Sequence, residues 1–404
     1  MAIYLGNNNI SPLHLGGVEI AEAYFGSVKV YPDGDPYNPL NLPPHTIRCQ
    51  FTRGYTPDGT LVDADKNIWD IYESSNDWSG LLDISQGTLV RVLGANTTGV
   101  TNMRRLFKFG ISLESVPLFD TSAVTDMSEM FYYCRKLETV PLFDTSSVTN
   151  MSRMFDLCES LISVPLFDTH SVTDMELMFY NCHNLPTVPL FDTSSVTDMS
   201  GMFTDCDRLT TVPLFDTSSV TDMSAMFVRC PRLASVPLFD TSSVTNMEAM
   251  FFECHNLPTV PLFDTSLVTN MGGMFENCVS LKTVPLFDTS SVTTMIEMFF
   301  GCSDLTEVPL FDTSSVTNMN DMFYYCTSLK TVPLFDTSSV IRMNNMFYRC
   351  RAVESGALAL YNQASTQANP PTYHDYTFTE CGRDTVTGSE ELSQIPASWG
   401  GTAA

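Results

Sequence analysis

The text VPLFDTSSVTNM at residues 140–151 recurs, with small changes, through most of this chain. Its first six letters, VPLFDT, begin at residues 116, 140, 164, 188, 212, 236, 260, 284, 308 and 332, at an unbroken period of 24. A fixed period of this length is typical of stacked arrays, in which each repeat contacts only its neighbours. We therefore predict a solenoid, and the length of the chain gives no count of separate domains.

The hydrophobic period changes within each repeat, which predicts two kinds of local structure. The segment MSEMFYYC at 127–134 places its methionines, phenylalanine and cysteine at the i, i+3, i+4 and i+7 positions of one helix face. It is predicted as a short helix with Asp126 as its N-cap. The VPLF segment is predicted to be extended, with Val140 and Leu142 as the inward residues.

Ten of the twelve cysteines share one repeat position, from Cys134 to Cys350. A uniform period does not favour the alternate pairing that disulfides between successive coils would need. We interpret these cysteines as buried free thiols that pack as small hydrophobic residues.

The chain around the repeats divides by composition. Residues 1–30 have glycine after an apolar residue at intervals of ten, a pattern typical of a small β-meander. Residues 31–45 are rich in proline and are predicted as a linker. Residues 46–91 are predicted as an N-terminal cap. Residues 92–355 hold eleven repeats, of which the first is degenerate, and residues 356–404 are predicted as a C-terminal cap.

The charge and hydropathy of the chain exclude some classes of partner. With 46 acidic and 20 basic residues among 404, the net charge is −26, so a nucleic-acid backbone would be repelled. The first residues lack the basic and apolar regions of a secretory signal, and no 18 apolar residues run together. We therefore expect no nucleic-acid partner, no membrane insertion and no export by the secretory-signal route.

The sequence contains no pattern of catalytic residues. The six histidines are scattered, and the nucleophile-elbow, zinc-helix and phosphate-loop motifs do not occur. A row of equivalent residues offers no unique acid–base pair. We predict that the protein is not an enzyme and needs no cofactor.

An aspartate follows the VPLF segment in every repeat. Asp-Thr-Ser is a natural Asx-turn, in which backbone N–H groups offset the repulsion between stacked carboxylates. The alternative is a ladder of oxygen ligands for calcium. The aspartates concerned are Asp120, Asp144, Asp168, Asp192, Asp216, Asp240, Asp264, Asp288, Asp312 and Asp336.

The pattern LxTVPLFDTSSVTDMSxMFxxCxxL resembles the BspA-like branch of leucine-rich repeats over residues 92–355. This resemblance implies a right-handed parallel solenoid used for adhesion and recognition. The predicted fold class is therefore an α/β solenoid, a leucine-rich-repeat-like parallel stack of coils with a small N-terminal all-β module and terminal caps.

The flanks of the repeats resemble phage proteins. The start, MAIYLGNNNISPLHLGGVEIAEAYFGSVKVY at 1–31, resembles the β-rich start of many tailed-phage structural proteins. The segments FTRGYTP at 51–57, NIWDIYESSNDWSGLL at 67–82 and ELSQIPASWGGT at 391–402 are similar to caps on phage-encoded repeats. The resemblance implies a virion location, with attachment to other virion proteins through residues 1–45. A homo-oligomer is compatible with this arrangement.

The two residues after Met-Phe change from repeat to repeat, whereas the VPLFDT text is constant. On the predicted helix they face outward. One interpretation is that outer positions drift where nothing constrains them. The other is recognition, since tyrosine, phenylalanine and arginine are enriched in binding surfaces. The candidate ligand-binding residues are Tyr132, Tyr133, Tyr180, His183, Phe252, His255, Tyr324, Tyr325, Tyr348 and Arg349.

These observations lead us to expect a non-enzymatic, virion-associated binding protein. It would be a fibre or decoration component that presents its solenoid to a host-surface glycan or protein, or to an environmental ligand. Two alternatives stay open. One is a structural spacer within the virion that binds no ligand, and the other is a cellular BspA-like surface adhesin.

Overall fold

A computed structural model of the chain describes residues 42–51, 70–82 and 89–403 in full, together with the backbone of short strands before and between them. The predicted linker at 31–45 lies mostly outside the described residues, and its boundaries stay a prediction. The chain divides into two compact units, Met1–Ser195 and Val196–Ala404, and each is described by itself.

The first unit begins with short antiparallel strands. They are β1 (Leu13–Leu15), β2 (Val18–Ile20), β3 (Ala23–Phe25), β4 (Val28–Pro32), β5 (Thr46–Phe51), β6 (Gly54–Tyr55), β7 (Leu61–Val62), β8 (Ile68–Tyr72) and β9 (Leu89–Asn96). One five-stranded sheet has the order β3-β4-β8-β5-β9, and β1 with β2 and β6 with β7 form separate pairs. Because β4 pairs with β8, part of the predicted N-terminal module shares a sheet with the predicted cap.

The sheet leads into the coils through β9. Arg91 in this strand forms a parallel bridge with Ser115, one coil further on. Earlier in the chain, the backbone N–H of Trp78 donates to the carbonyl of Asn102 at 2.9 Å, and the Trp78 side chain is completely buried. This part of the predicted cap therefore continues the coil geometry and covers apolar side chains of the first coils.

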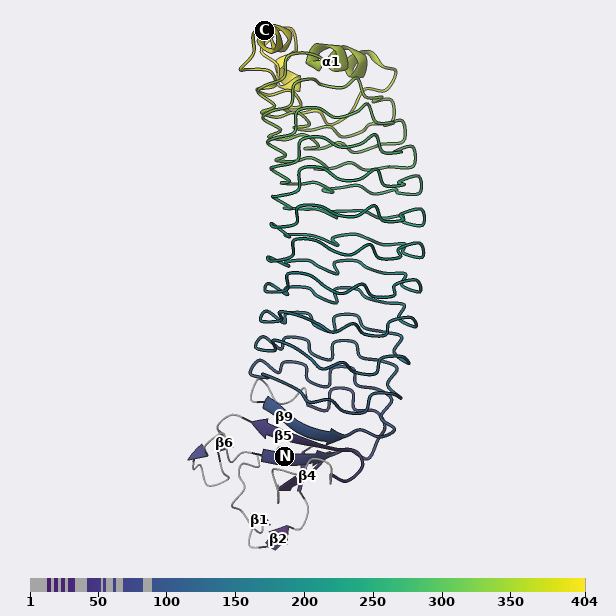
Figure 1. The fold of residues 1–404 in the computed structure, drawn as a ribbon. Coiled ribbons are helices and arrows are strands. Elements are labelled where there is room, and N and C mark those ends of the chain that lie inside the picture. Colours follow the sequence, from purple (N-terminus) through teal and green to yellow (C-terminus); the bar gives the residue numbers. More distant parts are fainter. Residues whose placement is uncertain are drawn as a thin grey trace. The chain divides into compact units, whose positions relative to one another are not determined.

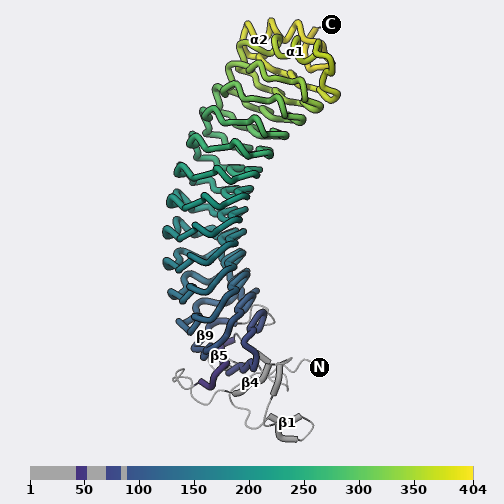
Figure 2. The backbone as a smooth tube through the Cα atoms, turned by 90° about the vertical axis from the view of Figure 1, so that its right-hand side faces the viewer, coloured from purple at the N-terminus to yellow at the C-terminus, as the bar shows by residue number. Residues whose placement is uncertain are grey.

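Within each unit, the coils run parallel and lie in register. Single-residue parallel bridges join equivalent positions 24 residues apart, from Asn102 to Asp174 in the first unit and from Asp198 to Arg342 in the second. Figures 1 and 2 show the successive turns of the second unit one above another. The fold is a repeating solenoid of the leucine-rich-repeat type, as predicted.

The predicted helix at 127–134 is wrong, because the segment folds as two consecutive turns. The N–H groups of Met130 and Cys134 donate to carbonyls three residues back, at 3.1 and 3.0 Å. The N–H groups of Glu129 and Tyr133 donate instead to carbonyls of the next coil, at 2.9 and 2.7 Å. These two residues have φ of 55° and 65°, in the left-handed region.

A helix would use nearly all of its N–H groups within the segment and leave few for stacking. Two turns of four residues also bring the i, i+3, i+4 and i+7 side chains to one side, so the hydrophobic spacing does not distinguish them from a helix. Asp126 still caps the segment, since its carboxylate accepts the N–H of Ser128 at 2.8 Å.

The interior of each unit is a set of stacked columns of identical side chains. In one coil the fully buried residues are Val148, Met151, Met154, Phe155, Cys158 and Leu161. Successive phenylalanine rings from Phe203 to Phe347 stack with centroids 5.1–5.8 Å apart. All twelve cysteines are free and buried, so the prediction of packed thiols is confirmed.

The predicted inward Leu142 is wrong, because this leucine faces outward. The N–H of Phe143 donates to the carbonyl of Pro141 at 3.0 Å, which closes a three-residue turn with Leu142 at its apex. Phe143 therefore points into the core with 2% exposure, while Leu142 is 59% exposed. Val140 is buried, as predicted.

The C-terminal residues close the last coil of the second unit. They form α1 (Ala357–Thr366), α2 (Val386–Leu392) and the 3-10 helix η4 (Ala397–Trp399). The N–H of Phe347 donates to the carbonyl of Thr377 at 2.8 Å, and Phe378 stacks on the Phe347 ring at 5.9 Å. In the part of the chain that the structure describes, no helix is both long enough and apolar enough to cross a membrane.

Candidate ligand-binding surface

The two variable residues that follow Met-Phe lie on the second turn of each coil. The second of them is in the left-handed region, with φ of 65° at Tyr133 and 60° at both Tyr325 and Arg349. A bulky residue in this region costs roughly 1–2 kcal/mol. Backbone hydrogen bonds between coils enforce this conformation, since the N–H of Tyr325 donates to the carbonyl of Tyr348 in the next coil at 2.9 Å. Most of these side chains are half-buried rather than fully outward as predicted, and a few, such as Asp156, are buried.

Four of the predicted residues meet Phe300 in the second unit. We call this group the Tyr324 cluster: Phe300, Tyr324, Tyr325, Tyr348 and Arg349. The Tyr324 ring lies flat between Phe300 and Tyr348, with centroids 4.7 and 4.8 Å away. Tyr325 lies 4.8 Å from Tyr324 at an interplanar angle of 47°. The cluster is therefore a continuous aromatic surface across three coils.

A single guanidinium borders this aromatic surface. Arg349 lies over the rings of Tyr325 and Tyr348, at 5.1 and 5.3 Å from their centroids, and donates to the Tyr325 hydroxyl. Glu380 holds the same guanidinium at 3.3 Å. Burial raises the pKa of Tyr324, so its hydroxyl stays protonated at neutral pH. The cluster offers flat apolar faces, hydroxyl groups and one cation, a combination suited to sugar rings or to polar groups of a protein.

Two further predicted residues, Tyr132 and Tyr133, meet neighbours that were not predicted in the first unit. We call this group the Tyr132 cluster: Lys108, Phe109, Tyr132, Tyr133 and Arg135. Phe109 contacts both tyrosines edge-on, with centroids 5.6 and 5.9 Å away. The Lys108 ammonium lies 4.5 Å from the Tyr132 ring, and Arg135 lies 5.5 Å from the Tyr133 ring. Cations therefore border aromatic faces here as well.

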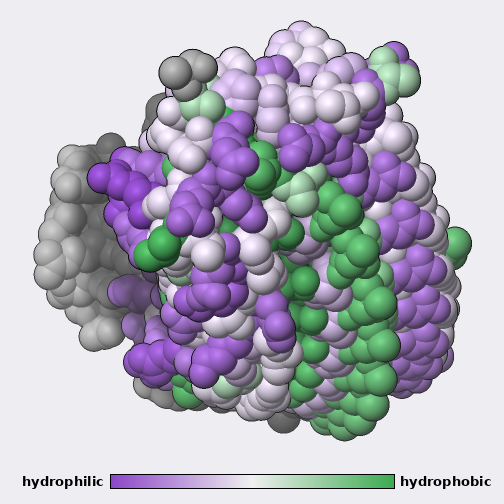
Figure 3. Space-filling model, turned by 90° about the horizontal axis from the view of Figure 1, so that it is seen from above, coloured by the Kyte–Doolittle hydropathy of each residue, from purple (hydrophilic) through white to green (hydrophobic). Residues whose placement is uncertain are grey.

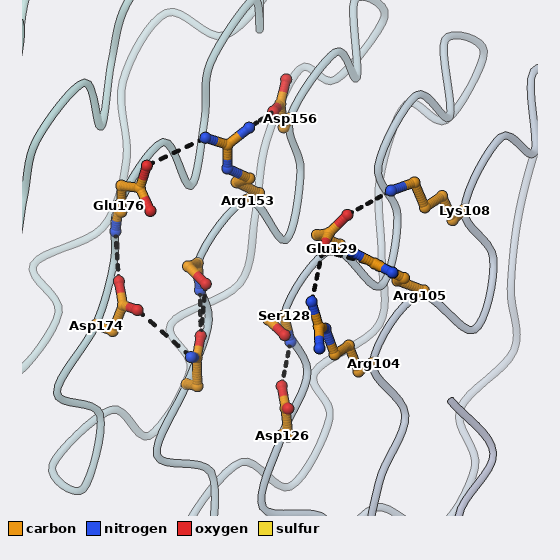
Figure 4. Close-up of polar contacts among 12 residues, drawn as sticks. Arg104, Arg105, Lys108, Asp126, Ser128, Glu129, Arg153, Asp156, Asp174 and Glu176 are labelled. Atoms are coloured by element: carbon orange, nitrogen blue, oxygen red, sulfur yellow. Dashed lines mark hydrogen bonds and ion pairs between the residues drawn. The ribbon is translucent and has the colours of Figure 1, made fainter. Parts of the chain in front are cut away.

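Three cations converge on one carboxylate beside the Tyr132 cluster (Figure 4). Glu129 accepts Arg104, Arg105 and Lys108 at 3.2, 2.7 and 2.5 Å. Burial acts to raise the pKa of Glu129, but the hydrogen bonds from Arg105 and Lys108 outweigh it and lower the pKa to about 2. The carboxylate is therefore charged at neutral pH and fixes the three cations beside the Tyr132 cluster.

Asp156, one coil further on, is a buried carboxyl with an incomplete set of partners. Its Oδ2 lies 3.8 Å from Arg153, which also contacts Glu176 at 3.1 Å (Figure 4). Its Oδ1 is buried without a hydrogen-bond partner. Burial raises the pKa of Asp156 to about 7.

Acidic side chains gather in the second unit around Glu276, one of the variable residues that follow Met-Phe. Burial, followed by the nearby Glu297, Glu253 and Asp321, raises the pKa of Glu276 to about 7. The negative charge around Glu276 therefore changes near neutral pH. The Tyr132 cluster differs, because cations border it.

The other predicted residues do not join either cluster. Tyr180 and Phe252 are half-buried, and within the described residues no ring contact links them to the clusters. His183 is half-buried and His255 is exposed. Sequence reasoning missed Lys108, Phe109 and Arg135, and it did not select Phe300 from the variable positions as a candidate. Lys108, Phe109 and Phe300 follow a leucine-phenylalanine or methionine-phenylalanine pair, so their place in the repeat could have identified them.

The aspartate row forms the predicted Asx-turns. Asp144 accepts the backbone N–H of Ser146 at 3.1 Å and its hydroxyl at 2.7 Å. These two hydrogen bonds lower the pKa of Asp144, and the repulsion from Asp168 is the smallest influence on it. Among the described residues, no group of three or more histidine, cysteine, aspartate or glutamate side chains is arranged to hold a metal ion.

The chain is similar to one protein family and to several solved structures. The family described as "Mycoplasma protein of unknown function, DUF285" matches residues 87–187, 158–260 and 255–361. A leucine-rich repeat protein from Eubacterium ventriosum is similar, at 18% identity and a TM-score of 0.37, over 65% of this chain and 80% of that chain. Another from Bacteroides ovatus has 19% identity and a TM-score of 0.38, over 76% and 88% of the two chains. No match occurs among curated proteins.

Proposed function

We propose that this chain, which belongs to the family described as "Mycoplasma protein of unknown function, DUF285", is a non-enzymatic binding or adhesion protein. The observation that carries the proposal is the Tyr324 cluster, where Phe300, Tyr324 and Tyr348 stack at 4.7 and 4.8 Å on the surface of the coils. Half-exposed aromatic residues with a bordering arginine are the residue types that concentrate binding energy at recognition surfaces.

The ligand we propose is a host-surface glycan or protein. Sugar rings have flat apolar faces that stack on aromatic side chains, and their hydroxyl groups pair with tyrosine hydroxyls and with the guanidinium of Arg349. The constant part of each coil supplies the scaffold, because most of its side chains, the exposed leucine excepted, are buried or hydrogen-bonded within the stack. The variable row would then set specificity.

The test is a binding screen of the intact chain on a glycan panel and on host envelope proteins. Changing Tyr324 and Tyr348 to Ser should abolish a binding signal of the wild-type chain and leave the fold intact. The control is Tyr376→Ser, since Tyr376 is an exposed tyrosine outside the row. Retained binding by the double variant would contradict the proposal.

We further propose that the protein is carried on a virion, with residues 1–45 attaching it to other virion proteins. The support is the resemblance of the N-terminal sequence to starts of tailed-phage structural proteins. Deletion of residues 1–22 tests the location and leaves β3 and β4 in the five-stranded sheet. The truncated chain should fold but fail to join particles, and normal incorporation would exclude attachment through residues 1–22.

A further inference from the structure

One exposed position is apolar in all ten copies of the VPLFDT text. The leucine row consists of Leu118, Leu142, Leu166 and Leu190 in the first unit and Leu214, Leu238, Leu262, Leu286, Leu310 and Leu334 in the second. These side chains are 50–65% exposed. The space-filling view from above shows hydrophobic surface gathered in a stripe beside a hydrophilic one (Figure 3).

The fold accounts for the other constant residues but not for this one. Asp144 closes its turn with Ser146, and the hydroxyl of Thr145 donates to the carbonyl of Asp168 in the next coil at 2.7 Å. Leu142 stands at the apex of a three-residue turn, which constrains the backbone and not the side chain. The exposed serine and threonine of the constant text make hydrogen bonds, as Ser146 does with Asp144 and Thr149 with the carbonyl of Thr125. Exposed positions outside that text, such as those of Arg135 and Lys136, vary from coil to coil. The leucine side chain is therefore constant without a hydrogen bond that requires it.

A row of fixed negative charges borders the leucines. The aspartate two residues after each leucine is also exposed, and its side chain is held by the Asx-turn. The hydrogen bonds from the following serine lower the pKa of Asp144, Asp192, Asp240, Asp264 and Asp312, so these carboxylates are ionised well below neutral pH. Within each unit the surface therefore alternates one apolar and one anionic group per coil.

We infer that the leucine row and the aspartate row together dock a cationic amphipathic polypeptide, one that presents apolar side chains flanked by lysine or arginine. Apolar contact supplies the affinity, and charge complementarity selects the partner. This surface is separate from the variable aromatic row. It would hold a partner of constant chemistry while the aromatic row meets the ligand.

Charge disfavours the other occupants. A second copy of the chain would bring its own aspartate row, and the net charge of each copy is −26. Anionic lipid headgroups and nucleic acid would be repelled for the same reason.

The test uses the full chain and a synthetic helical peptide of leucine and lysine with one apolar and one cationic face. Two control peptides separate the contributions: a scrambled sequence of the same composition, and the same apolar pattern with glutamate in place of lysine. By fluorescence anisotropy at physiological salt, the first peptide should bind about tenfold more tightly than the scrambled one. The glutamate peptide should not bind.

Variants of the chain locate the binding. Changing Leu238, Leu262, Leu286 and Leu310 to Ser should weaken binding of the leucine-lysine peptide at least about tenfold. The matched control changes Ile162, Leu267 and Ile341 to Ser, since these side chains have similar exposure outside the row, and it should bind as the wild type.

A second variant keeps the test decisive if the serine variant fails to fold. Changing Asp240, Asp264, Asp288 and Asp312 to Asn retains the oxygen that accepts the turn hydrogen bonds and removes the charge. It should also weaken binding and flatten its dependence on salt. Wild-type affinity in either folded variant would overturn the inference. So would self-association or binding to anionic vesicles that the leucine changes abolish.

Discussion

At the scale of the residue, the turns of each coil hold side chains in conformations that they would not otherwise adopt. Each coil has two positions with positive φ, and only three of the twenty in residues 116–355 are glycine. The N–H at such a position bonds to the next coil, so stacking overrides the local preference. Sequence-based propensities describe a single coil, so they could not predict positive φ values at residues other than glycine.

We predict that Ala225→Gly stabilises the protein by about 1 kcal/mol, because glycine adopts φ of 56° without the steric penalty of a Cβ. Thermal unfolding measures the change. The control is Ala234→Gly, an exposed position without positive φ, where glycine should give no gain. Equal effects at the two positions would show that the left-handed turns carry no strain.

A second prediction concerns Asp156, whose ordinary pKa of 3.8 is raised by burial to about 7. Between these values the folded state binds more protons than the unfolded state, so this carboxyl lowers stability as the pH rises through the window. Asp156→Asn should therefore stabilise the protein by about 1–3 kcal/mol at about pH 8 and have little effect at about pH 4.

The control for Asp156 is Asp304→Asn, because Asp304 is exposed. The Asp304→Asn substitution should change the unfolding free energy of the protein little at either pH. A gain for Asp156→Asn that is the same at both pH values would show that ionisation of the buried carboxyl does not limit stability.

At the scale of the element, one threonine per coil joins neighbouring turns. The buried Thr241 hydroxyl donates to the carbonyl of Asp264 at 2.7 Å, and the equivalent bond recurs within each unit. The hydroxyl of the exposed Thr221 donates to the carbonyl of Thr197 over a longer distance of 3.3 Å. In the last coil, isoleucine (Ile341) replaces this threonine. The two threonines of the repeat therefore differ in their contribution to stacking.

Thr241→Val should cost about 1–2 kcal/mol of unfolding free energy, because it removes a part-buried hydrogen bond to the carbonyl of Asp264 and hardly changes the side-chain volume. Thr221→Val should stay within about 0.5 kcal/mol of the wild type. Chemical denaturation of the two variants makes the comparison. A similar loss in both would show that the short bond is not specific to stacking.

The sequence predicts part of each element. Period, inward methionines, phenylalanines and cysteines, and the Asx-turns of the aspartate row all follow from the repeat, since they depend on spacing alone. The helix prediction fails because two four-residue turns share the helical spacing. The inward prediction for Leu142 fails because the three-residue turn at Pro141 shifts the alternation by one, which puts Phe143 inside.

At the scale of the whole molecule, burial of the cysteines has a chemical consequence. All twelve are buried free thiols. Burial raises the pKa of Cys158, Cys254 and Cys326 well above the ordinary value, so the reactive thiolate is scarce. A thiol reagent should modify none of the twelve in the native protein and all of them after denaturation. Rapid modification of native protein would contradict the packing.

The candidate site was only partly predictable from the sequence. The repeat identified the variable row, and the structure brings Tyr324, Tyr325, Tyr348 and Arg349 together as one cluster. It leaves Tyr180 apart, because ring contacts need aromatic residues in successive coils. The exposed leucines were missed, since apolar residues in a repeat are ordinarily assigned to the core.

The most direct test of the account compares the two surfaces in one adsorption measurement on host cells or on a glycan that binds the wild type. The account predicts that Tyr324→Ser with Tyr348→Ser abolishes adsorption. It also predicts that Ser at Leu238, Leu262 and Leu286 leaves adsorption unchanged. Loss of adsorption in the leucine variant alone, with both variants folded, would contradict the assignment of recognition to the aromatic row.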